Sequence, residues 1–187
     1  MTVLEIASSK TAEEVETILE RLQPAFPCLA RVTERCSRQP RLVKPELSFS
    51  GSALAINFVP AIDPERDVFS YHHLRRDVYD IVTAAGVEVA SRYYHPSAHV
   101  TIARFARQQE FTLYREDGAW FDRARGEKLI KGFESIDRWL QDEYAPRDDG
   151  SVRPGGMWVV GEDKGLECWK GTIWYGGGED VLARAIN

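Results

Sequence analysis

Residues 87–105 read VEVASRYYHPSAHVTIARF, and the second half of this stretch decides the predicted fold. Pro96 breaks the chain, and a run in which polar and apolar side chains alternate follows it. Such alternation is typical of a half-buried β-strand. Because side chains alternate along a regular strand, we expect His99, Thr101 and Ala103 to share one face.

The pair of His99 and Thr101 suits phosphate chemistry. A histidine can move protons near neutral pH, and a threonine hydroxyl can donate a hydrogen bond to a phosphoryl oxygen. Ala103 leaves room for a ligand beside them. The stretch contains no carboxylate pair, no glycine-rich phosphate cradle and no set of metal ligands. A His-x-Thr tripeptide also occurs by chance, so a structural histidine is the alternative on these residues alone.

The rest of the chain predicts two similar rounds of strands and helices. The predicted strands are residues 1–7, two strands within 41–61 that turn at 50–52, a short strand before Pro96, residues 98–105, 157–162 and one or two within 166–177. The predicted helices are residues 11–26, 67–86 and a third within 125–144. This order, without a visible linker, predicts one α+β domain of two lobes that spans residues 1–187.

Capping residues mark the ends of two predicted helices. Thr11 is a good N-cap, and Glu14 three residues later completes a capping box. Pro24 and Pro27 are expected to end this helix, and Gly86 to end the next one. The apolar stripe of that second helix is predicted to be Tyr71, Leu74, Val78, Ile81 and Ala85.

The composition predicts a globular chain without a membrane anchor. Of the 187 residues 43% are hydrophobic, but no run approaches the ~20 apolar residues that span a bilayer. No basic region precedes an apolar core at the N-terminus, so no secretory signal is visible. Cys28, Cys36 and Cys168 are scattered without CxxC spacing, which argues against a disulfide framework and a zinc knuckle. A reducing, cytoplasmic location is therefore expected.

The charge pattern gives weak signs of nucleic-acid binding. The formal net charge of −5 does not favour long-range attraction to nucleic acid. The segment 31–44 is locally basic, and we favour a solvated loop over a phosphate contact for it. Aromatic side chains could stack on a nucleobase, although packing in the core is the favoured role of each: Phe49, Tyr93, Tyr94, Trp174 and Tyr175.

A second, partial copy of the strand motif stands at the start of the chain. The residues MTVLEI at 1–6 match VTIARF at 100–105 position by position, and Thr2 then corresponds to Thr101. His99 precedes the second copy. Six positions alone are weak evidence of a repeat.

The chain resembles the two-histidine (2H) phosphoesterase superfamily, which includes the 2′-5′ RNA ligase-like proteins and cyclic nucleotide phosphodiesterases. It looks most like a fungal branch often labelled RNA ligase/cyclic nucleotide phosphodiesterase. The stretches that carry this resemblance are RLVKPELSFSGSALAINFVPA at 41–61, YHHLRRDVYD at 71–80, residues 87–105, and GEDKGLECWKGTIWYGGGED at 161–180. The resemblance implies two pseudo-symmetric lobes of antiparallel sheet, with flanking helices, around a central cleft. It also implies that His99 is catalytic, that Thr101 and Thr2 bind phosphate, and that no metal or other cofactor is required.

The resemblance is incomplete at the first motif. Members of this branch typically read His-Met-Thr-x-Leu-Glu-Ile there, whereas this sequence starts Met1-Thr2-Val3-Leu4-Glu5-Ile6 and lacks the histidine. Either a longer protein has been truncated, or a short natural member has lost a catalytic group. One positioned acid or base is worth ~10²–10⁴-fold in rate, so we expect weakened activity. His72, His73 or His95 could substitute, although a structural or solvated role is favoured for each.

We therefore predict a hydrolase that acts on 2′,3′-cyclic phosphates or related RNA and nucleotide phosphodiesters by metal-free histidine acid/base catalysis. The expected ligand is an RNA end or a cyclic nucleotide, which Tyr94 and Tyr175 could help to bind, and no membrane is involved. Two alternatives stay open. The chain could be a non-catalytic descendant that binds nucleotide or RNA, or an enzyme of another reaction class that uses the same cleft.

Overall fold

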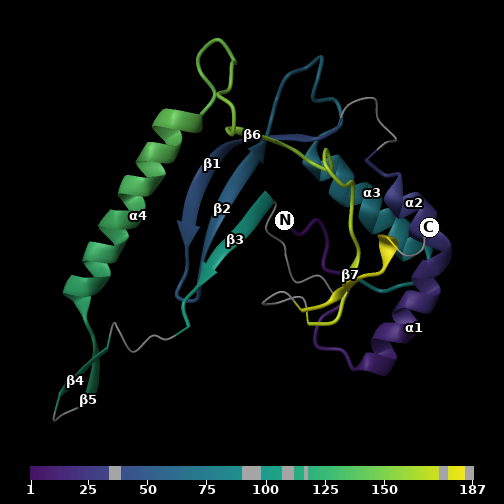
Figure 1. Cartoon of the computed structure of the whole chain (residues 1–187), viewed down its shortest axis with the longest axis horizontal. Helices are drawn as coiled ribbons and strands as arrows, with labels where there is room; N and C mark the ends of the chain where they lie inside the picture. The colour runs from purple at the N-terminus through teal and green to yellow at the C-terminus, as the bar shows by residue number, and fades with distance from the viewer. Residues whose placement is uncertain (34–38, 90–97, 107–111, 116–117, 173–176, 184–187) are drawn as a thin grey trace. The chain divides into compact units, whose positions relative to one another are not determined.

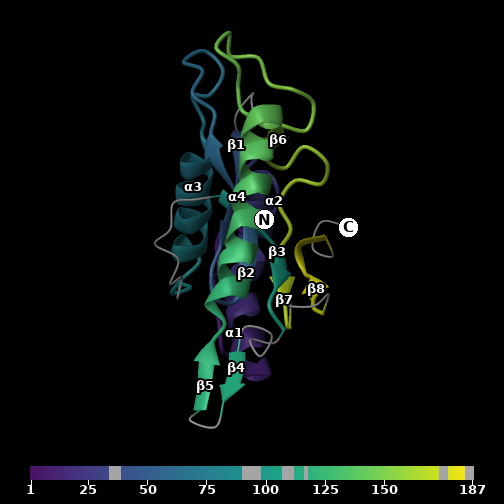
Figure 2. The same cartoon turned by 90° about the vertical axis from the view of Figure 1, so that its left-hand side faces the viewer.

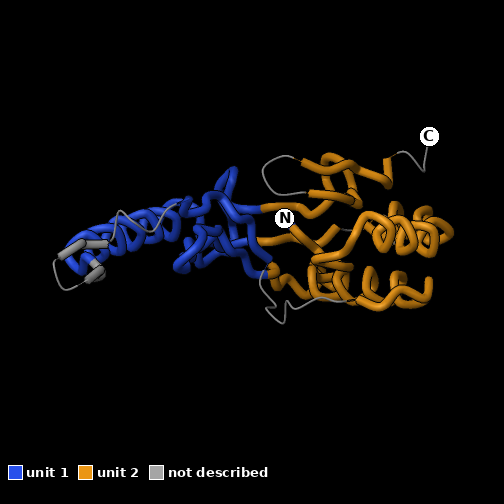
Figure 3. Tube along the Cα trace, turned by 90° about the horizontal axis from the view of Figure 1, so that it is seen from below, with its two compact units in different colours: residues 1, 43–59, 97–157 blue, residues 2–42, 60–96, 158–187 orange. Residues whose placement is uncertain are grey.

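A computed structural model describes residues 1–33, 39–89, 98–106, 112–115, 118–172 and 177–183. The chain divides into two compact units, coloured separately in Figure 3. Unit 1 consists of Met1, Val43–Val59 and Ser97–Met157, and unit 2 consists of Thr2–Leu42, Pro60–Pro96 and Trp158–Asn187. The chain passes from one unit to the other several times, so neither unit is a continuous stretch of sequence.

Four antiparallel strands form one sheet in the order β3-β2-β1-β6 (Figure 1). They are β1 (Arg41–Phe49), β2 (Ala53–Pro60), β3 (Ala98–Arg104) and β6 (Met157–Val159). The predicted turn between β1 and β2 is confirmed. The Ser50 N–H donates to the Ala53 carbonyl at 2.9 Å, and Ser50 Oγ accepts hydrogen bonds from the N–H groups of Ser52 and Ala53.

Unit 1 holds helix α4 (Arg123–Tyr144), which lies beside β1 on the side away from β2 (Figures 1 and 2). Every seventh residue of this helix is buried, at Gly126, Phe133 and Leu140, so one narrow stripe packs inward. Asp137 Oδ1 accepts a hydrogen bond from the Leu47 N–H at 2.8 Å. The helix therefore satisfies backbone groups that β1 does not pair with another strand.

A short hairpin precedes α4 and was not predicted from the sequence. Its strands are β4 (Thr112–Arg115) and β5 (Gly118–Phe121), and they pair antiparallel. β5 ends two residues before α4 begins, so the hairpin leads directly into the helix (Figure 2). The Asp122 side chain caps the helix by accepting a hydrogen bond from the Arg125 N–H.

Unit 2 is mainly helical. It contains α1 (Ala12–Leu22), the 3₁₀ turn η1 (Gln23–Ala25), α2 (Phe26–Ala30), α3 (Tyr71–Ala84) and a two-stranded ladder of β7 (Trp169–Lys170) and β8 (Glu179–Asp180). Its buried side chains include Leu22, Phe26, Leu29, Val32, Leu42, Leu74, Val78, Val82, Val87 and Leu182. The predicted capping box of Thr11 and Glu14 is confirmed at the start of α1.

The two prolines after α1 act differently from the prediction. α1 ends at Leu22, but the chain continues into η1 and α2 without leaving the helical region. Pro24 lies in η1, and Pro27 occupies the first turn of α2. A proline in a first turn costs no hydrogen bond, because that N–H has no partner within the helix. The prolines therefore divide one predicted helix into three segments.

α3 ends at Ala84, and the predicted stop, Gly86, follows two residues later with a φ of 77°. Its buried stripe is partly different. Tyr71, Leu74 and Val78 are buried as expected, but the fourth buried residue is Val82 and not Ile81. A spacing of four residues from Val78 keeps Val82 on the same side of the helix.

The strand predicted at residues 1–7 is wrong. The structure has no helix or strand between residues 1 and 11. Thr2 is exposed there, and the neighbouring Val3, Leu4 and Ile6 are half-buried. Tertiary contacts can hold an alternating apolar segment without pairing it in a sheet, so alternation by itself did not determine the structure. The α+β class and the antiparallel sheet are confirmed.

Among the described residues, no helix is both long enough and apolar enough to cross a membrane.

Candidate functional site

β3 places the predicted histidine and threonine on one face of the sheet. His99 lies opposite Asn57 of β2, and Thr101 lies opposite Ala55. Residues directly opposite in an antiparallel pair share a face, with their Cβ atoms about 4.5–5.5 Å apart. His99 is half-buried and Thr101 is exposed.

A β-bulge interrupts β3 after Thr101. The register shifts by one residue, so that Ala55 faces Thr101 but Leu54 faces Ala103. Ile102 is the extra residue and has no partner on β2. The side chain of Ala103 therefore lies on the face opposite to Thr101. The prediction that Ala103 shares a face with His99 is wrong, because it assumed a strand without a bulge.

The same bulge brings Arg104 to the side of the histidine. Arg104 lies opposite Ala53, two residues before Ala55 on β2. Because side chains alternate along β2, Ala53 and Ala55 share a face, and Arg104 shares it with Thr101 and His99. Regular alternation would place Arg104 on the other face. Reasoning from the sequence missed the bulge, because no residue type in this stretch indicates one.

The hairpin adds two residues of β1 to this surface. The pair of Ser50 and Ala53 closes the turn, and counting back from it places Ser48 opposite Ala55 and Glu46 opposite Asn57. The contact of Ser48 Oγ with the Ala55 carbonyl at 3.4 Å agrees with this register. We call the surface the histidine face. Its members are His99, Thr101 and Arg104 of β3, Asn57, Ala55 and Ala53 of β2, and Ser48 and Glu46 of β1.

The other face of these strands is apolar. The residues that point there are Leu47, Phe49, Leu54, Ile56, Phe58, Ala98 and Val100. α4 contacts this side, since the rings of Phe49 and Phe133 are 5.0 Å apart between centroids. Of these residues Ala98 is buried, Phe49 is 46% exposed and the others are half-buried. A slip of one residue along a strand would exchange the two faces.

The histidine face combines three groups that suit a phosphate ester. Successive same-face positions on a strand are about 7 Å apart, so Thr101 lies between His99 and Arg104 at roughly this spacing from each. The imidazole can take or give a proton, the hydroxyl can donate a hydrogen bond, and the guanidinium can pair with phosphate oxygens. Together they could hold a phosphodiester and exchange protons with it.

The other predicted site residues are placed as follows. Thr2 lies in unit 2, where its carbonyl accepts a hydrogen bond from the Tyr71 hydroxyl at 3.0 Å. His99 and Thr101 belong to unit 1. Tyr94 and Tyr175 lie outside the described residues. The predicted phosphate-binding role of Thr2, and the ligand-binding roles of both tyrosines, therefore stay predictions.

The histidines considered as substitutes differ in their surroundings. His73 caps α3, since its Nδ1 lies 3.1 Å from the Ser70 N–H and 3.0 Å from Ser70 Oγ. This arrangement supports the structural role that was favoured for it. His72 is exposed on the same helix, where its ring meets the edge of Tyr71. His95 lies outside the described residues.

One residue of the basic segment 31–44, Arg41, forms an ion pair. Arg41 donates two hydrogen bonds of 2.8 Å to the Asp67 carboxylate, whose side chain is only 4% exposed. Burial alone would raise the pKa of Asp67, but the hydrogen bonds from Arg41 and from the Asp63 N–H outweigh it and lower the pKa. Arg41 therefore holds the 61–67 loop in place rather than offering a free cation. Residues 34–38 lie outside the described residues.

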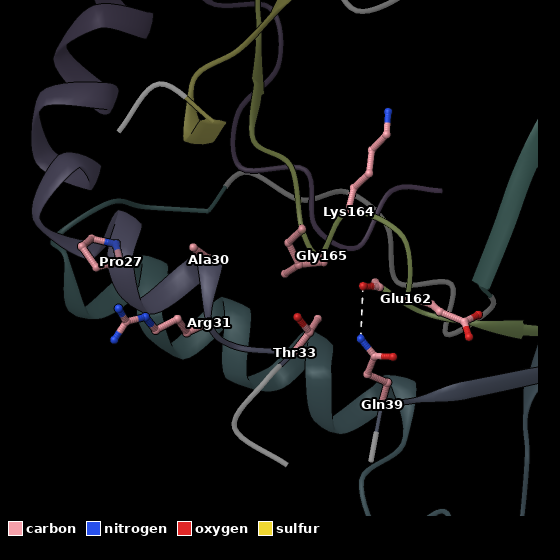
Figure 4. Close-up of a pocket in the computed structure, with 10 residues that line it drawn as sticks. Pro27, Ala30, Arg31, Thr33, Gln39, Glu162, Lys164 and Gly165 are labelled. Atoms are coloured by element: carbon pink, nitrogen blue, oxygen red, sulfur yellow. Dashed lines mark hydrogen bonds between the residues drawn. The ribbon is translucent and has the colours of Figure 1, made fainter. Parts of the chain in front are cut away.

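Unit 2 contains a cavity of about 630 Å³ between α2 and the 161–165 loop (Figure 4). Its described lining residues are Pro27, Ala30, Arg31, Thr33, Gln39, Gly161, Glu162, Lys164, Gly165 and Leu166. Gln39 donates to the Gly161 carbonyl at 3.1 Å and holds the loop. The charged side chains of Arg31, Glu162 and Lys164 point away from one another in the close-up, so they do not converge on one ligand group. None of the predicted site residues lines this cavity.

Within the described parts of the chain, no three histidine, cysteine, aspartate or glutamate side chains lie close enough together to hold a metal ion. Comparison of the chain with protein-family models, with curated proteins and with solved structures finds no match.

Proposed function

We propose that this protein is a phosphoesterase that hydrolyses 2′,3′-cyclic phosphates or related RNA and nucleotide phosphodiesters on the histidine face. The observation that carries the proposal is the presence of His99, Thr101 and Arg104 on one face of the sheet. An imidazole, a hydroxyl and a guanidinium provide proton transfer, hydrogen bonding and charge for one phosphate group. The resemblance of the sequence to the 2H phosphoesterases supports the same chemistry.

The proposed reaction is hydrolysis of a cyclic phosphodiester to a phosphate monoester. Water attacks phosphorus, one ribose P–O bond breaks, and the released ribose oxygen takes a proton. His99 provides either the base that accepts a proton from water or the acid that protonates the leaving oxygen. Thr101 donates a hydrogen bond to a non-bridging phosphate oxygen, and Arg104 stabilises the charge that builds up on it.

A second candidate function is binding of the same ligands without turnover. Hydrolysis needs both an acid and a base, and His99 is the one histidine among the described residues of the histidine face. With solvent in the other role, turnover is expected to be slower by about 10²–10⁴-fold than with two positioned groups. Retention of Thr101 and Arg104 would still allow the face to bind a phosphate ester.

The experiment measures hydrolysis of nucleoside 2′,3′-cyclic phosphates by chromatography, and binding of a nucleoside 2′-monophosphate by calorimetry. His99→Ala is expected to abolish hydrolysis and to retain binding. Thr101→Val is expected to weaken both. The control is His72→Ala, which removes an exposed histidine from α3. Since the proposed steps use protons only, EDTA is expected to leave the rate unchanged.

The outcomes separate the two functions. Hydrolysis that requires His99 supports the phosphoesterase. Binding that depends on Thr101, with no product after long incubation, supports the binding protein instead. If cyclic phosphates neither react nor bind, or if His99→Ala and Thr101→Val behave like the His72→Ala control, both proposals are wrong.

A further inference from the structure

Helix α4 carries a second stripe of side chains beside its buried one. The positions of this stripe are separated alternately by four and three residues, so they follow one side of the helix. We call it the outer stripe, and its members are Arg125, Leu129, Gly132, Ile136, Trp139 and Glu143. Ile136 is 47% exposed and Trp139 is 53% exposed. The described parts of the chain therefore leave apolar side chains of the outer stripe open to a further partner.

Two copies of the outer stripe are complementary when the helices lie antiparallel. The two-fold axis of such a pair would pass beside residue 134, because the positions of the stripe are spaced equally on either side of it. Leu129 of one copy then lies opposite Trp139 of the other, so two apolar side chains meet. Gly132 lies opposite Ile136, so a large side chain meets a position that has none. Each contact forms twice, as two-fold symmetry requires.

The packing within the chain does not require a glycine at position 132. Gly132 lies inside α4. Apart from its chain neighbours and the backbone of its own helix, no heavy atom of the described chain lies within 4 Å of the point where a Cβ atom would stand. Glycine inside a helix is less favourable than alanine, because it loses more conformational freedom on folding. A second helix explains the residue, since the missing side chain makes room for Ile136 of the other copy.

The charges of α4 favour the same antiparallel pairing. Four basic side chains and one acidic one lie within residues 123–131, whereas one basic and four acidic ones lie within residues 134–143. The first turn has no acidic residue and the last turn has no basic one. This order opposes the helix macrodipole, which favours anions near the N-terminus and cations near the C-terminus. An antiparallel second helix offsets this cost by placing each basic half beside an acidic half.

The two ends of the outer stripe carry opposite charges. At one end, Arg125 Nε lies 3.2 Å from Asp122 Oδ2. At the other end, Glu143 forms an ion pair with Arg153. In the antiparallel pair Arg125 lies opposite Glu143 of the other copy, which extends both ion pairs into a network of charges across the contact.

We propose that the outer stripe is the contact surface of a symmetric dimer, in which α4 pairs antiparallel with α4 of a second copy of this chain. The self-complementary order of charged, apolar and small residues is the observation that carries the proposal. It does not depend on the proposed hydrolysis. α4 contacts the apolar face of the sheet through Phe133 and Phe49, so the pairing leaves the histidine face uncovered.

The first test measures self-association by analytical ultracentrifugation over a wide range of concentration. We expect a reversible dimer of the unmodified chain with a Kd below about 100 µM. Ile136→Ser should weaken the dimer at least about tenfold, because it removes apolar surface from two contacts. Gly132→Leu should weaken it as well, because it fills the space opposite Ile136. The matched control is Ile130→Ser, since Ile130 is 40% exposed but lies on the other side of Phe133.

The second test exchanges the charges at the ends of the outer stripe. Arg125→Glu and Glu143→Arg each place like charges opposite one another, so each variant alone should dimerise more weakly. A mixture of the two variants should dimerise like the unmodified chain, because the glutamates of one copy then face the arginines of the other at both ends. Both substitutions suit the helix macrodipole, so the helix itself is not expected to weaken. Circular dichroism checks that each variant is folded.

Several results would overturn the proposal. One is a chain that stays monomeric at every concentration, and another is a dimer that Ile136→Ser weakens no more than Ile130→Ser does. Failure of the mixed charge variants to dimerise better than either alone would show that the helices are not paired antiparallel. A monomer that binds lipid vesicles through Ile136 would assign the outer stripe to a membrane surface instead.

Discussion

The hydroxyl of Tyr71 donates a hydrogen bond to the backbone carbonyl of Thr2 at 3.0 Å, and Tyr71 itself is completely buried. Helix α3 thereby holds the first residues of the chain in unit 2. The contact explains how a segment without secondary structure keeps a defined place. Burial raises the pKa of the Tyr71 hydroxyl, so it stays a proton donor over the usual range of pH.

Tyr71→Phe is expected to destabilise the fold by about 1 kcal/mol, because the Thr2 carbonyl loses its partner while the ring still fills its space. Urea unfolding measures this change. Limited proteolysis should also show faster cleavage within residues 2–10. The matched control is Tyr79→Phe, which removes the hydroxyl of an exposed tyrosine on the same helix. Equal stability of the two variants would contradict the anchoring role of Tyr71.

The ion pair of Arg41 and Asp67 predicts a loss of stability in acid. The lowered pKa of Asp67 means that its carboxylate stabilises the folded state above its ordinary value of 3.8. This contribution is lost as the pH falls through the lower value of the folded protein. Asp67→Asn is expected to cost about 1–3 kcal/mol near pH 7, since it leaves Arg41 without its carboxylate. The cost should shrink below about pH 4.

Denaturant titrations of both proteins between pH 3 and pH 7 measure this effect. Asp77→Asn serves as the control because Asp77 pairs with the exposed Arg76. Exposed pairs contribute about 0–1 kcal/mol, so this variant should lose little. A difference between the unmodified chain and Asp67→Asn that stays constant with pH would contradict the prediction.

Because Arg104 lies on the histidine face, we expect phosphate binding to depend on which face of β3 carries the positive charge. Arg104→Ala should weaken binding of a nucleoside 2′-monophosphate by about tenfold, the effect of about 1.4 kcal/mol. Combining it with Ala103→Arg restores the charge one residue away but on the opposite face, and should not restore affinity. Arg104→Lys should retain part of it. Calorimetry measures the three affinities. Recovery of affinity in the double variant would show that the face is irrelevant.

Two cysteines should differ in reactivity. Burial, followed by the nearby charge of Asp180, raises the pKa of the Cys168 thiol to about 11, whereas Cys28 is exposed. The thiolate is the reactive form, so iodoacetamide at pH 8 should modify Cys28 at least about tenfold faster than Cys168. Mass spectrometry of digested samples measures both rates, and in urea they should converge. A fast reaction of Cys168 in the folded protein would contradict its burial.

The sequence predicted those elements whose signals are local. The capping box of Thr11 and Glu14, the stop at Gly86 and the turn at 50–52 each depend on a few adjacent residues, and all three are confirmed. The strand that carries His99 was also predicted, with its start at Ala98. Its alternation holds from Ala98 to Thr101, before the bulge.

The incorrect predictions concern features that depend on contacts between residues far apart in the sequence. The first residues of the chain alternate like a strand, but their partner is the Tyr71 hydroxyl of a helix and not another strand. The bulge at Ile102 depends on how β3 registers with β2, which a single strand does not reveal. For the same reason the sequence alone would place Arg104 on the wrong face. Cross-strand neighbours become visible only once the register is known.

The bulge at Ile102 also limits how the length of β3 can vary. Deleting one residue between Thr101 and Arg104 would remove the bulge and leave the arginine two residues after Thr101, still opposite Ala53 and on the same face. An insertion of one residue between His99 and Thr101 would instead turn the histidine and the hydroxyl to opposite faces. The strand can therefore lose a residue at the bulge more easily than it can gain one before Thr101. Engineered insertions are best placed in the 50–52 turn, where the chain reverses, because they leave the alternation of side chains in both strands unchanged.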